Sequence, residues 1–337
     1  MLLRDPVHGL VSFEHEEESI IVRLLETPEV QRLRRIRQLG LTCLAFPGAE
    51  HTRFAHAIGA AFVMQRFIER LRQIHDDLPF WQRLTSERAR DALAAAFLHD
   101  LGHGPLSHLF EDALAHTERA HGLGLGSADG VGDSNNTRRH EDWTEQILLD
   151  PSTGVHKVLV QDDPELPRRV VGLIRGEHPL PYLARAVSGT FDVDRCDYLL
   201  RDAHATGVRY GEYDLPWLLS TLRFTEPASS SSSDAPPSAG DEVAPGLAID
   251  GSKGLSAIES FILARLFMFQ QVYFHKSTRA AEWMIRVILT RAVSLIKDGT
   301  RLPRVPAALT AIAAGEVPSL GSYLELDDQV LLETLNV

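Results

Sequence analysis

The segment AAFLHDLGHGPLSH, residues 95–108, brings four side chains that can bind metals or carry protons into a span of ten residues. These side chains are His99, Asp100, His103 and His108. Neutral imidazole and carboxylate together suit a borderline or hard divalent cation such as Mn, Fe, Co, Ni, Zn or Mg. A neighbouring His-Asp pair is also common at an ordinary helix end, but the glycines at positions 102 and 104 allow the tight turn that a converging site needs.

Three further segments carry the same residue types. They are HTRFAH with His51, Arg53 and His56, DVDRCDYLLRDAH at 192–204, and RHEDW with His140 and Glu141. In the second segment, Asp194, Tyr198 and Asp202 lie at i, i+4 and i+8 and share one helix face, while Arg195 and Asp197 lie off it. A polar helix start and a charged surface helix are the plain alternatives, and the residues alone leave them open.

Helical periodicity dominates the elements that must position these residues. Apolar residues recur at three- and four-residue spacing over 54–74, and the segment 86–102 begins at a Ser86 cap and ends at Gly102. Thr27-Pro28 divides residues 16–39 into two short helices, and residues 256–296 form one long helix or two. We therefore expect a mainly α fold with a small β-hairpin, whose strands are TLRF and GLAI.

Two segments have the composition of loops. Residues 121–138 are rich in Gly, Asp and Asn, and residues 225–246 form a Ser/Pro/Ala tract that predicts a disordered insert between the hairpin strands. Helical periodicity resumes after the second loop. We therefore expect one large domain over residues 1–302 and a short helical C-terminal tail over residues 303–337.

The overall composition narrows the classes of partner. The 337 residues carry a net charge of −12, which disfavours broad electrostatic binding to nucleic acid or to anionic membranes. There is no run of about 18 apolar residues, so we expect no membrane-spanning segment. The two cysteines, Cys43 and Cys196, are too few for a disulfide framework, and a cytoplasmic location is the simplest interpretation.

The order of the clusters, H…HD…D, resembles the HD phosphohydrolase superfamily. Longer segments extend the match to its deoxynucleoside triphosphate (dNTP) triphosphohydrolases with a sterile-alpha-motif domain, and to their bacterial relatives. These segments are RDPVHG, TPEVQRLRRIRQLG, FPGAEHTRFAHAIG, LHDLGHGPLSHLFE, DVDRCDYLLRD and VYFHK. The resemblance concerns the HD part of these proteins and does not include a sterile-alpha-motif domain. It implies that residues 1–302 form an HD phosphohydrolase domain that cleaves a dNTP to deoxynucleoside and inorganic triphosphate.

The resemblance also implies a metal centre. Its ligands are His56, His99, Asp100 and Asp194. They imply one divalent transition metal, Mn, Fe, Co, Ni or Zn, with Mg²⁺ on the substrate phosphates as an additional option. Four protein ligands leave positions open on a six-coordinate ion for water and a phosphate oxygen.

The catalytic residues that the resemblance implies are Arg53, His103, His108, Glu111, His140 and Glu141. Arg53 and His103 match residues that hold α-phosphate oxygens. His108 matches the general acid that protonates the leaving 5′ oxygen, and Glu111 matches the acid that orients it.

The substrate contacts that it implies are Gln38, Leu39, Arg195, Tyr198, Asp202, Arg265, Tyr273 and Lys276. Gln38, Leu39 and Asp202 match contacts to the sugar 3′-hydroxyl, and Tyr198 matches the aromatic residue that crowds the 2′ position. Arg265, Tyr273 and Lys276 are expected on one side of the long helical stretch. One departure is Phe269, which stands where the family has His.

Two alternatives to a dNTP triphosphohydrolase stay open. Phe269 is compatible with an HD phosphohydrolase that acts on another nucleotide, such as a dNMP, an analogue or a signalling nucleotide. A non-catalytic nucleotide-sensing protein is the other alternative, although a purely structural metal would need neither Arg53, His103 nor His108. The resemblance further implies a homo-oligomer, either a dimer or a tetramer.

Overall fold

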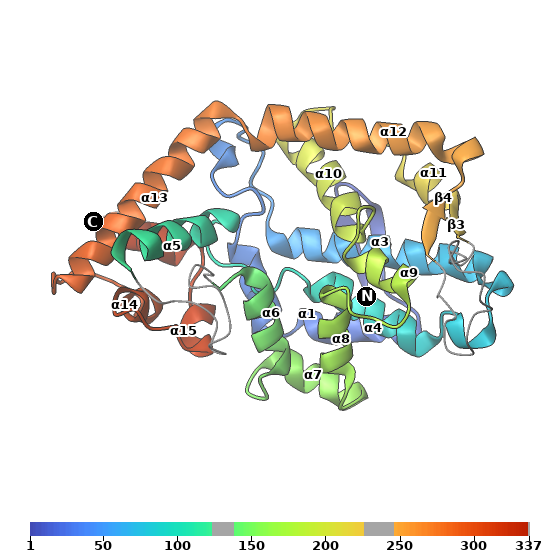
Figure 1. Cartoon of the computed structure of the whole chain (residues 1–337), viewed down its shortest axis with the longest axis horizontal. Coiled ribbons are helices and arrows are strands. Elements are labelled where there is room, and N and C mark those ends of the chain that lie inside the picture. The colour runs from blue at the N-terminus through green and yellow to red at the C-terminus, as the bar shows by residue number, and fades with distance from the viewer. Residues whose placement is uncertain (123–137, 226–245, 336–337) are drawn as a thin grey trace, which may run out of the picture.

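The computed structural model describes residues 1–122, 138–225 and 246–335, and within them the fold is mainly α-helical, as expected (Figure 1). The first half contains β1 (Leu2–Asp5), β2 (Gly9–Ser12), α1 (Ser19–Leu25), α2 (Pro28–Arg32), α3 (Arg53–Ile74), α4 (Ser86–Leu98), α5 (His108–His121), α6 (His140–Leu149) and α7 (Gly154–Asp162). The second half contains α8 (Leu166–Ile174), α9 (Pro181–Val187), α10 (Val193–Thr206), α11 (Leu215–Ser220), β3 (Leu222–Phe224), β4 (Leu247–Ile249), α12 (Gly251–Met268), the π-helical turn η6 (Phe269–Tyr273), α13 (Lys276–Lys297), α14 (Ala307–Ala313), α15 (Leu320–Leu324) and α16 (Asp328–Leu335).

Helices α3, α4 and α10 form the centre of the molecule, with α12 across one side and α13 along another (Figure 1). The run from Ala92 to Leu98 in α4 is at most 1% exposed, so α4 is surrounded by the core. Each fully buried Leu or Phe contributes about 2 kcal/mol to stability. Gly59 lets α3 approach α10 closely, because a Cβ atom there would lie 1.9 Å from Asp197 Oδ1.

The helix boundaries refine the sequence prediction. The break at Thr27-Pro28 separates α1 from α2 as expected. The cap of α4 is Thr85 rather than Ser86: its side chain accepts a hydrogen bond from the Arg88 backbone N–H, satisfying a group that the first helical turn leaves free. The helix also ends at Leu98 rather than Gly102, so the chain leaves the helix as it reaches the His-Asp pair.

Residues 256–296 form two helices rather than one. The π-helical turn η6 follows α12, and α13 begins at Lys276 with the His275 side chain as its cap. The register of a single helix therefore ends before Lys276. The expectation that Lys276 shares a helix side with Arg265 and Tyr273 was wrong for this reason.

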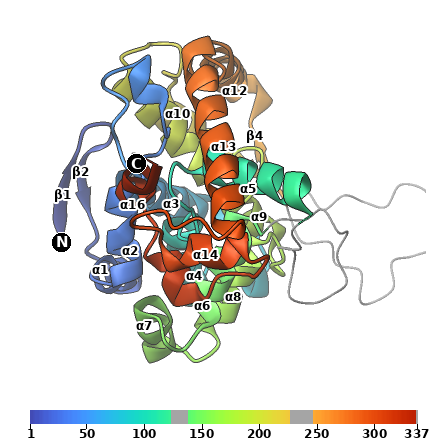
Figure 2. The same cartoon turned by 90° about the vertical axis from the view of Figure 1, so that its left-hand side faces the viewer.

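The small hairpin is confirmed at its flanks. β3 pairs with β4 in antiparallel register, with Leu222 opposite Ile249. The predicted disordered insert, and most of the predicted Gly-rich loop, lie outside the described residues. A second hairpin, β1–β2, was not predicted from the sequence, and Figure 2 shows it at one edge of the molecule.

The C-terminal helices pack on the segment that follows α4. The Tyr323 hydroxyl donates to the Gly102 carbonyl oxygen at 2.8 Å, and its ring stacks on Trp143 at 3.8 Å between centroids. Arg32 Nε donates to the Leu326 carbonyl oxygen at 2.9 Å. Residues 303–337, predicted as a helical tail, therefore include helices that touch the neighbourhood of the His-Asp pair.

Helices α12 and α13, with Phe274 between them, expose ten large apolar side chains. These are Leu255, Ile262, Leu263, Leu266, Phe267, Phe274, Trp283, Met284, Val287 and Ile288. Among the described residues, the helical stretch Gly251–Tyr273 is long and apolar enough to cross a membrane by length and composition, which the sequence analysis had not expected. A single helix of this kind is weak evidence for a membrane span, and its Ala257, Phe261, Ala264 and Met268 face the core.

Candidate active site

The fold brings His56, His99, Asp100 and Asp194 together, and we call them the metal cluster. His56 comes from α3, His99 and Asp100 follow α4, and Asp194 lies in the first turn of α10. One ligand atom from each residue lies within 4.8 Å of every other. His56 Nε2 is 3.0 Å from Asp194 Oδ1 and 3.4 Å from His99 Nε2. Three segments far apart in the sequence thus converge on one point.

The two imidazoles of the metal cluster are held in the orientation that a cation needs. His56 Nδ1 lies 2.8 Å from Asp197 Oδ2, and His99 Nδ1 lies 2.9 Å from the Ala96 carbonyl oxygen. Both oxygens can only accept, so each Nδ1 carries a hydrogen and donates it. When the ring is neutral, the Nε2 lone pair then faces the other ligands. The donor set therefore fits a divalent transition metal.

Behind His56 lies a buried ionic network that sequence reasoning missed. Asp197 is fully buried, and besides His56 its oxygens accept hydrogen bonds from His8 Nε2 at 2.6 Å and from Arg201 Nε and Nη2 at 2.8 and 2.9 Å. Arg201 Nη1 also donates to Asp5 Oδ2 at 2.8 Å, and Asp5 Oδ1 accepts two backbone N–H groups of the β1–β2 turn. The N-terminal hairpin thereby fixes a metal ligand.

The charges of the metal cluster are strongly coupled. Burial alone lowers the pKa of His56, but Asp194 and Asp197 raise it to about 10. Burial likewise lowers the pKa of His99, while Asp100 and Asp194 raise it to about 9. Against the effect of burial, the two imidazoles hold the pKa of Asp194 well below its usual range. Without a cation the imidazoles hold protons at neutral pH, and a cation must displace them.

Arg53 connects the metal cluster to the loop between α4 and α5. Its Nη1 donates to Asp100 Oδ2, and its Nε donates to Ser107 Oγ at 2.7 Å. Leu106 and Ser107 have φ values of 56° and 59°, a left-handed conformation that costs about 1–3 kcal/mol for a residue other than glycine. Asp328 of α16 holds this loop by accepting the Leu106 backbone N–H at 2.7 Å.

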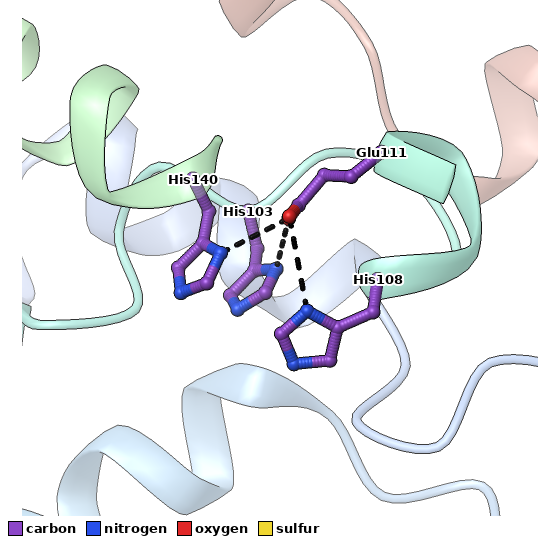
Figure 3. Close-up of side chains that lie close together, drawn as sticks. All are labelled: His103, His108, Glu111 and His140. Atoms are coloured by element: carbon purple, nitrogen blue, oxygen red, sulfur yellow. Dashed lines mark hydrogen bonds and ion pairs between the residues drawn. The ribbon is translucent and has the colours of Figure 1, made fainter. Parts of the chain in front are cut away.

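His103, His108, Glu111 and His140 form a second group beside the first, which we call the acid cluster (Figure 3). The Nδ1 atoms of the three imidazoles are directed at the Glu111 carboxylate, at 3.3 Å for His103, 3.8 Å for His108 and 3.1 Å for His140. His103 connects the two clusters, because its Nε2 lies 3.4 Å from Asp100 Oδ1. The predicted catalytic histidines thus share one carboxylate.

The members of the acid cluster differ in exposure and charge. The His108 side chain is 69% exposed, whereas His103 is 1% exposed. Burial, with the charges of Arg53 and His140, lowers the pKa of His103 to about 3, so this ring is neutral. Burial raises the pKa of Glu111, but its histidine neighbours hold it well below the usual range. Glu141 is more peripheral, 3.3 Å from His140 and half exposed.

Gly102 lets α6 approach closely enough for His140 to join the acid cluster. A Cβ atom at Gly102 would lie 2.1 Å from the His140 carbonyl oxygen, so no other residue fits without moving α6. The Gly102 N–H donates to Thr144 Oγ1 at 2.9 Å, and this hydroxyl donates to the His99 carbonyl oxygen at 3.1 Å. One threonine of α6 therefore ties the helix to the His-Asp turn.

Three of the predicted substrate residues, Asp202, Tyr198 and Tyr273, lie close together. Asp202 Oδ2 accepts from the Tyr273 hydroxyl, and Asp202 Oδ1 accepts from His51 Nε2, both at 2.8 Å. The Tyr198 ring lies edge-on to Tyr273 at 6.3 Å. Both Asp202 oxygens are engaged, so a substrate hydroxyl would have to share this carboxylate.

Gln38, Leu39 and Arg195 are placed differently. Gln38 Oε1 is buried and has no hydrogen-bond partner within the described part of the chain. Leu39 is partly buried against the core. Arg195 Nη1 donates to Asp192 and to the Gly189 carbonyl oxygen, the latter at 2.6 Å, which directs part of its guanidinium to the start of α10.

The remaining predicted substrate residues lie on and after α12. The Arg265 guanidinium carbon is 5.7 Å from the centre of the Phe269 ring, and Phe269 lies edge-on to Tyr273. Burial and the charge of Asp194 raise the pKa of Tyr198, and the charges of Arg195 and Arg265 oppose this shift. Lys276 is exposed at the start of α13.

Comparison with family models agrees with this geometry. The HD domain model matches residues 53–150, and a model described as the HD associated region matches residues 243–304. The first range contains the whole acid cluster and three of the four members of the metal cluster. The fourth, Asp194, comes from α10 outside that range.

Comparison with known proteins extends over the whole chain. It is 35% identical to the uncharacterized protein YwfO of Bacillus subtilis, over 98% of this chain and 64% of YwfO. It is 30% identical to the deoxynucleoside triphosphate triphosphohydrolase SAMHD1 of Gallus gallus, over 67% of this chain and 37% of that protein. The chain thus spans less than two thirds of either relative.

Among solved structures, a phosphohydrolase (BT4208) from Bacteroides thetaiotaomicron matches with a TM-score of 0.74 and 29% identity. The match covers 100% of this chain and 72% of that one. The family models, the relatives and the shared fold lead to one conclusion. The chain belongs to the HD phosphohydrolase superfamily and resembles its SAMHD1-type members.

Proposed function

We propose that the protein is a metal-dependent dNTP triphosphohydrolase, which converts a dNTP and water into deoxynucleoside and inorganic triphosphate. The observation that carries this proposal is the contact of His103, a member of the acid cluster, with the metal-cluster residue Asp100, which Arg53 also contacts. A structural metal would need its ligands but no adjoining proton-carrying group. The relative SAMHD1, a deoxynucleoside triphosphate triphosphohydrolase, supports the substrate class.

The metal cluster supports one divalent transition ion, Mn, Fe, Co, Ni or Zn, because two imidazoles and two carboxylates suit all of these ions. When bound, such an ion supplies positive charge to a phosphate oxygen and lowers the pKa of a coordinated water. Mg²⁺ on the substrate phosphates is compatible with this arrangement.

The acid cluster supports proton delivery to the leaving oxygen. His108 is exposed enough to reach a substrate, and the negatively charged Glu111 carboxylate lies 3.8 Å from its Nδ1 and can orient the ring. Arg53 and His103 present donors next to Asp100, where negative charge on the phosphate shifts during cleavage. His140 and Glu141 extend the same group.

The residues around Asp202 support recognition of the deoxynucleoside. Tyr198 and Tyr273 present aromatic edges, and Gln38 offers a buried, unpaired Oε1 within the described residues. Leu39 adds apolar contact. Arg195, Arg265 and Lys276 add positive charges for the triphosphate, in a chain whose net charge is −12.

One assay tests the reaction. The purified chain is incubated with each of the four dNTPs and with GTP, in Mn²⁺ or Mg²⁺, and products are separated by ion-pair chromatography. We expect deoxynucleoside and triphosphate in equal amounts, and none with Asp100→Ala. Release of dNMP and pyrophosphate, or no turnover of any dNTP, would contradict the proposal.

A second candidate is hydrolysis of another nucleotide by the same centre. The observation that favours it is Phe269, which packs on Tyr273 and under Arg265 where the family has a histidine. A monophosphate hydrolysed faster than every dNTP would select this candidate. Nucleotide binding without any hydrolysis would select the non-catalytic sensor.

The expected dimer or tetramer and the cytoplasmic location stay predictions. The exposed apolar side chains of α12 and α13 form a surface on which the predicted oligomeric state can be tested. Sedimentation of the native chain beside a Trp283→Glu variant would show whether that surface joins copies, because a charge placed between apolar faces weakens association.

A further inference from the structure

We propose that the acid cluster is itself a second divalent-cation site, which takes a borderline ion of the Zn²⁺ type. The proposal concerns His103, His108, Glu111 and His140. Its structural part stands on the geometry of these residues. Its functional part, described below, rests on the proposed hydrolase activity.

The ligand geometry is the first support. One ligand atom from each of the four residues lies within 4.8 Å of every other, a limit that the metal cluster also meets. Figure 3 shows one nitrogen of each of the three imidazoles directed at the Glu111 carboxylate. Three neutral imidazoles and a carboxylate are ligands that Zn²⁺ and its neighbours among the transition metals accept. The residue types and their convergence therefore match a cation of this class.

An unsatisfied buried nitrogen is the second, independent support. His103 is 1% exposed, and its Nδ1 has no hydrogen-bond partner among the described residues. This atom lies 3.3 Å from Glu111 Oε1 but is not aligned for a hydrogen bond. A buried polar atom without a partner is costly, and a cation among the four ligands would satisfy it. The nitrogen faces the Glu111 carboxylate, on the side where the other two imidazoles also lie.

Access and neighbouring charge are compatible with a second ion. His108 is 69% exposed, so a cation can enter from solvent on that side. Its Nδ1 is the most distant from the carboxylate, at 3.8 Å, and a small rotation of the side chain would close the set. Asp100 provides negative charge between the two clusters through its contact with His103 Nε2. Arg53 is the opposing positive charge nearby.

Occupation of this site would remove the proton donor from the proposed reaction. A His108 ring that binds a cation through Nδ1 carries no hydrogen on that atom, and the Glu111 carboxylate then binds the ion instead of orienting a proton donor. Proton delivery and metal binding are therefore alternative states of the same four residues. The second cation is an inhibitor, and the first is the activator.

The number of bound ions tests the structural part. The full chain is dialysed against buffered Zn²⁺, and bound zinc is measured by mass spectrometry. We expect two ions per chain for the native protein and one for Glu111→Gln and for His140→Asn, which keep size but weaken ligation. His204→Asn is the matched control, because this exposed histidine of α10 lies outside both clusters, and it should keep two ions. Circular dichroism verifies that each variant is folded.

A native chain that binds one zinc ion would overturn the proposal. The proposal would also fail if the Glu111→Gln and His140→Asn variants bound as many zinc ions as the native chain. Crystals soaked in Zn²⁺ give a second readout, with anomalous peaks expected at both clusters. A single peak at the metal cluster would exclude the second site.

Titration of Zn²⁺ into the Mn²⁺-loaded chain tests the inhibitory part. We expect triphosphate release to fall at least tenfold as the second ion binds, while the first site stays filled. Full activity with two bound ions would overturn the inhibitory role. A chain that never hydrolyses a dNTP would refute the proposed function, yet its zinc count would still decide the second site.

Discussion

The metal cluster and the acid cluster lie side by side, yet they are built differently. The metal cluster is held from behind: Asp197 fixes the His56 ring, the Ala96 carbonyl fixes the His99 ring, and Arg201 fixes Asp197. Within the described part of the chain, the three imidazoles of the acid cluster meet at Glu111, and His108 is largely exposed. One group is preorganised for a constant task, whereas the other can rearrange.

The difference fits the chemistry that each cluster is proposed to perform. A resident cation is bound best by ligands whose tautomers and positions are set before it arrives. A proton donor must exchange protons with solvent and reach a leaving group, which favours an exposed ring such as His108. The same looseness also leaves the acid cluster open to a competing cation.

Removal of a metal ligand should give the largest effect. Asp100→Ala is expected to abolish both metal binding and triphosphate release, because it deletes a carboxylate ligand and the acceptor of the buried Arg53. An unpaired buried charge costs about 3–5 kcal/mol, so unfolding must be measured as well. Asp100→Asn keeps the volume and an acceptor for Arg53. Mass spectrometry that found a full metal complement in the folded Asn variant would place the metal elsewhere.

Disruption of the network behind His56 should give the next largest effect. Asp197→Asn removes the charge that pairs with Arg201, which is expected to lower the free energy of unfolding by about 3–5 kcal/mol. Loss of the His56 anchor should also weaken metal affinity by about 10–100-fold.

Calorimetric unfolding and metal titration measure these two effects separately. Asp298→Asn, at an exposed position after α13, should change stability by less than about 0.5 kcal/mol. If the folded Asp197→Asn chain bound metal as tightly as the native chain, the network would serve stability alone.

Proton release distinguishes the two clusters without a mutation. At pH 7 the metal-free His56 and His99, with pKa values of about 10 and about 9, both hold protons. Binding of the first ion should therefore release roughly two protons, and affinity should rise with pH. His103, with a pKa of about 3, has no proton to release. Isothermal titration in buffers of different ionisation enthalpy counts the protons.

The same raised pKa values predict how the stability of the metal-free chain depends on pH. Both histidines bind protons more tightly in the fold than at the ordinary value of 6.5. Their contribution is fully present below pH 6.5 and is lost as the pH rises towards about 9 and then about 10. Metal-free protein whose unfolding free energy did not fall over this range would show that these rings are neutral in the fold.

Much of the helical framework was predictable because its signals are local. The apolar spacing of α3 and the proline that starts α2 act within a few residues, and the sequence shows both. The hairpin strands β3 and β4 were also found, because each has its own apolar pattern. The break between α12 and α13 was left open, since apolar periodicity continues through η6.

The support of the site was much harder to predict, because it depends on contacts between distant segments. Asp197 lies off the helix face that carries Asp194, so the sequence suggested no role for it. In the structure, it lies one turn after Asp194 in α10 and accepts a hydrogen bond from His56 Nδ1. Asp5 and His8 occur in the quoted segment RDPVHG, but nothing local connects them to Arg201 and Asp197, which lie 196 and 189 positions away. The resemblance provided the cluster residues, and only the fold showed what holds them.

The smallest effect is expected where the C-terminal helices touch the turn between the clusters. Tyr323→Phe removes the hydrogen bond to the Gly102 carbonyl oxygen but keeps the ring on Trp143. The expected loss is about 1 kcal/mol, or about 2 °C in melting temperature. Tyr323→Ala also removes the stacked ring and should cost about 3–5 kcal/mol.

Metal content should stay at the native level in Tyr323→Phe, because Ala96 and Asp197 still anchor the ligands. Turnover should fall a few-fold, because the turn that carries His103 becomes less rigid. Lost metal with unchanged turnover per bound ion would reverse this assignment and connect the C-terminal helices to the metal cluster instead.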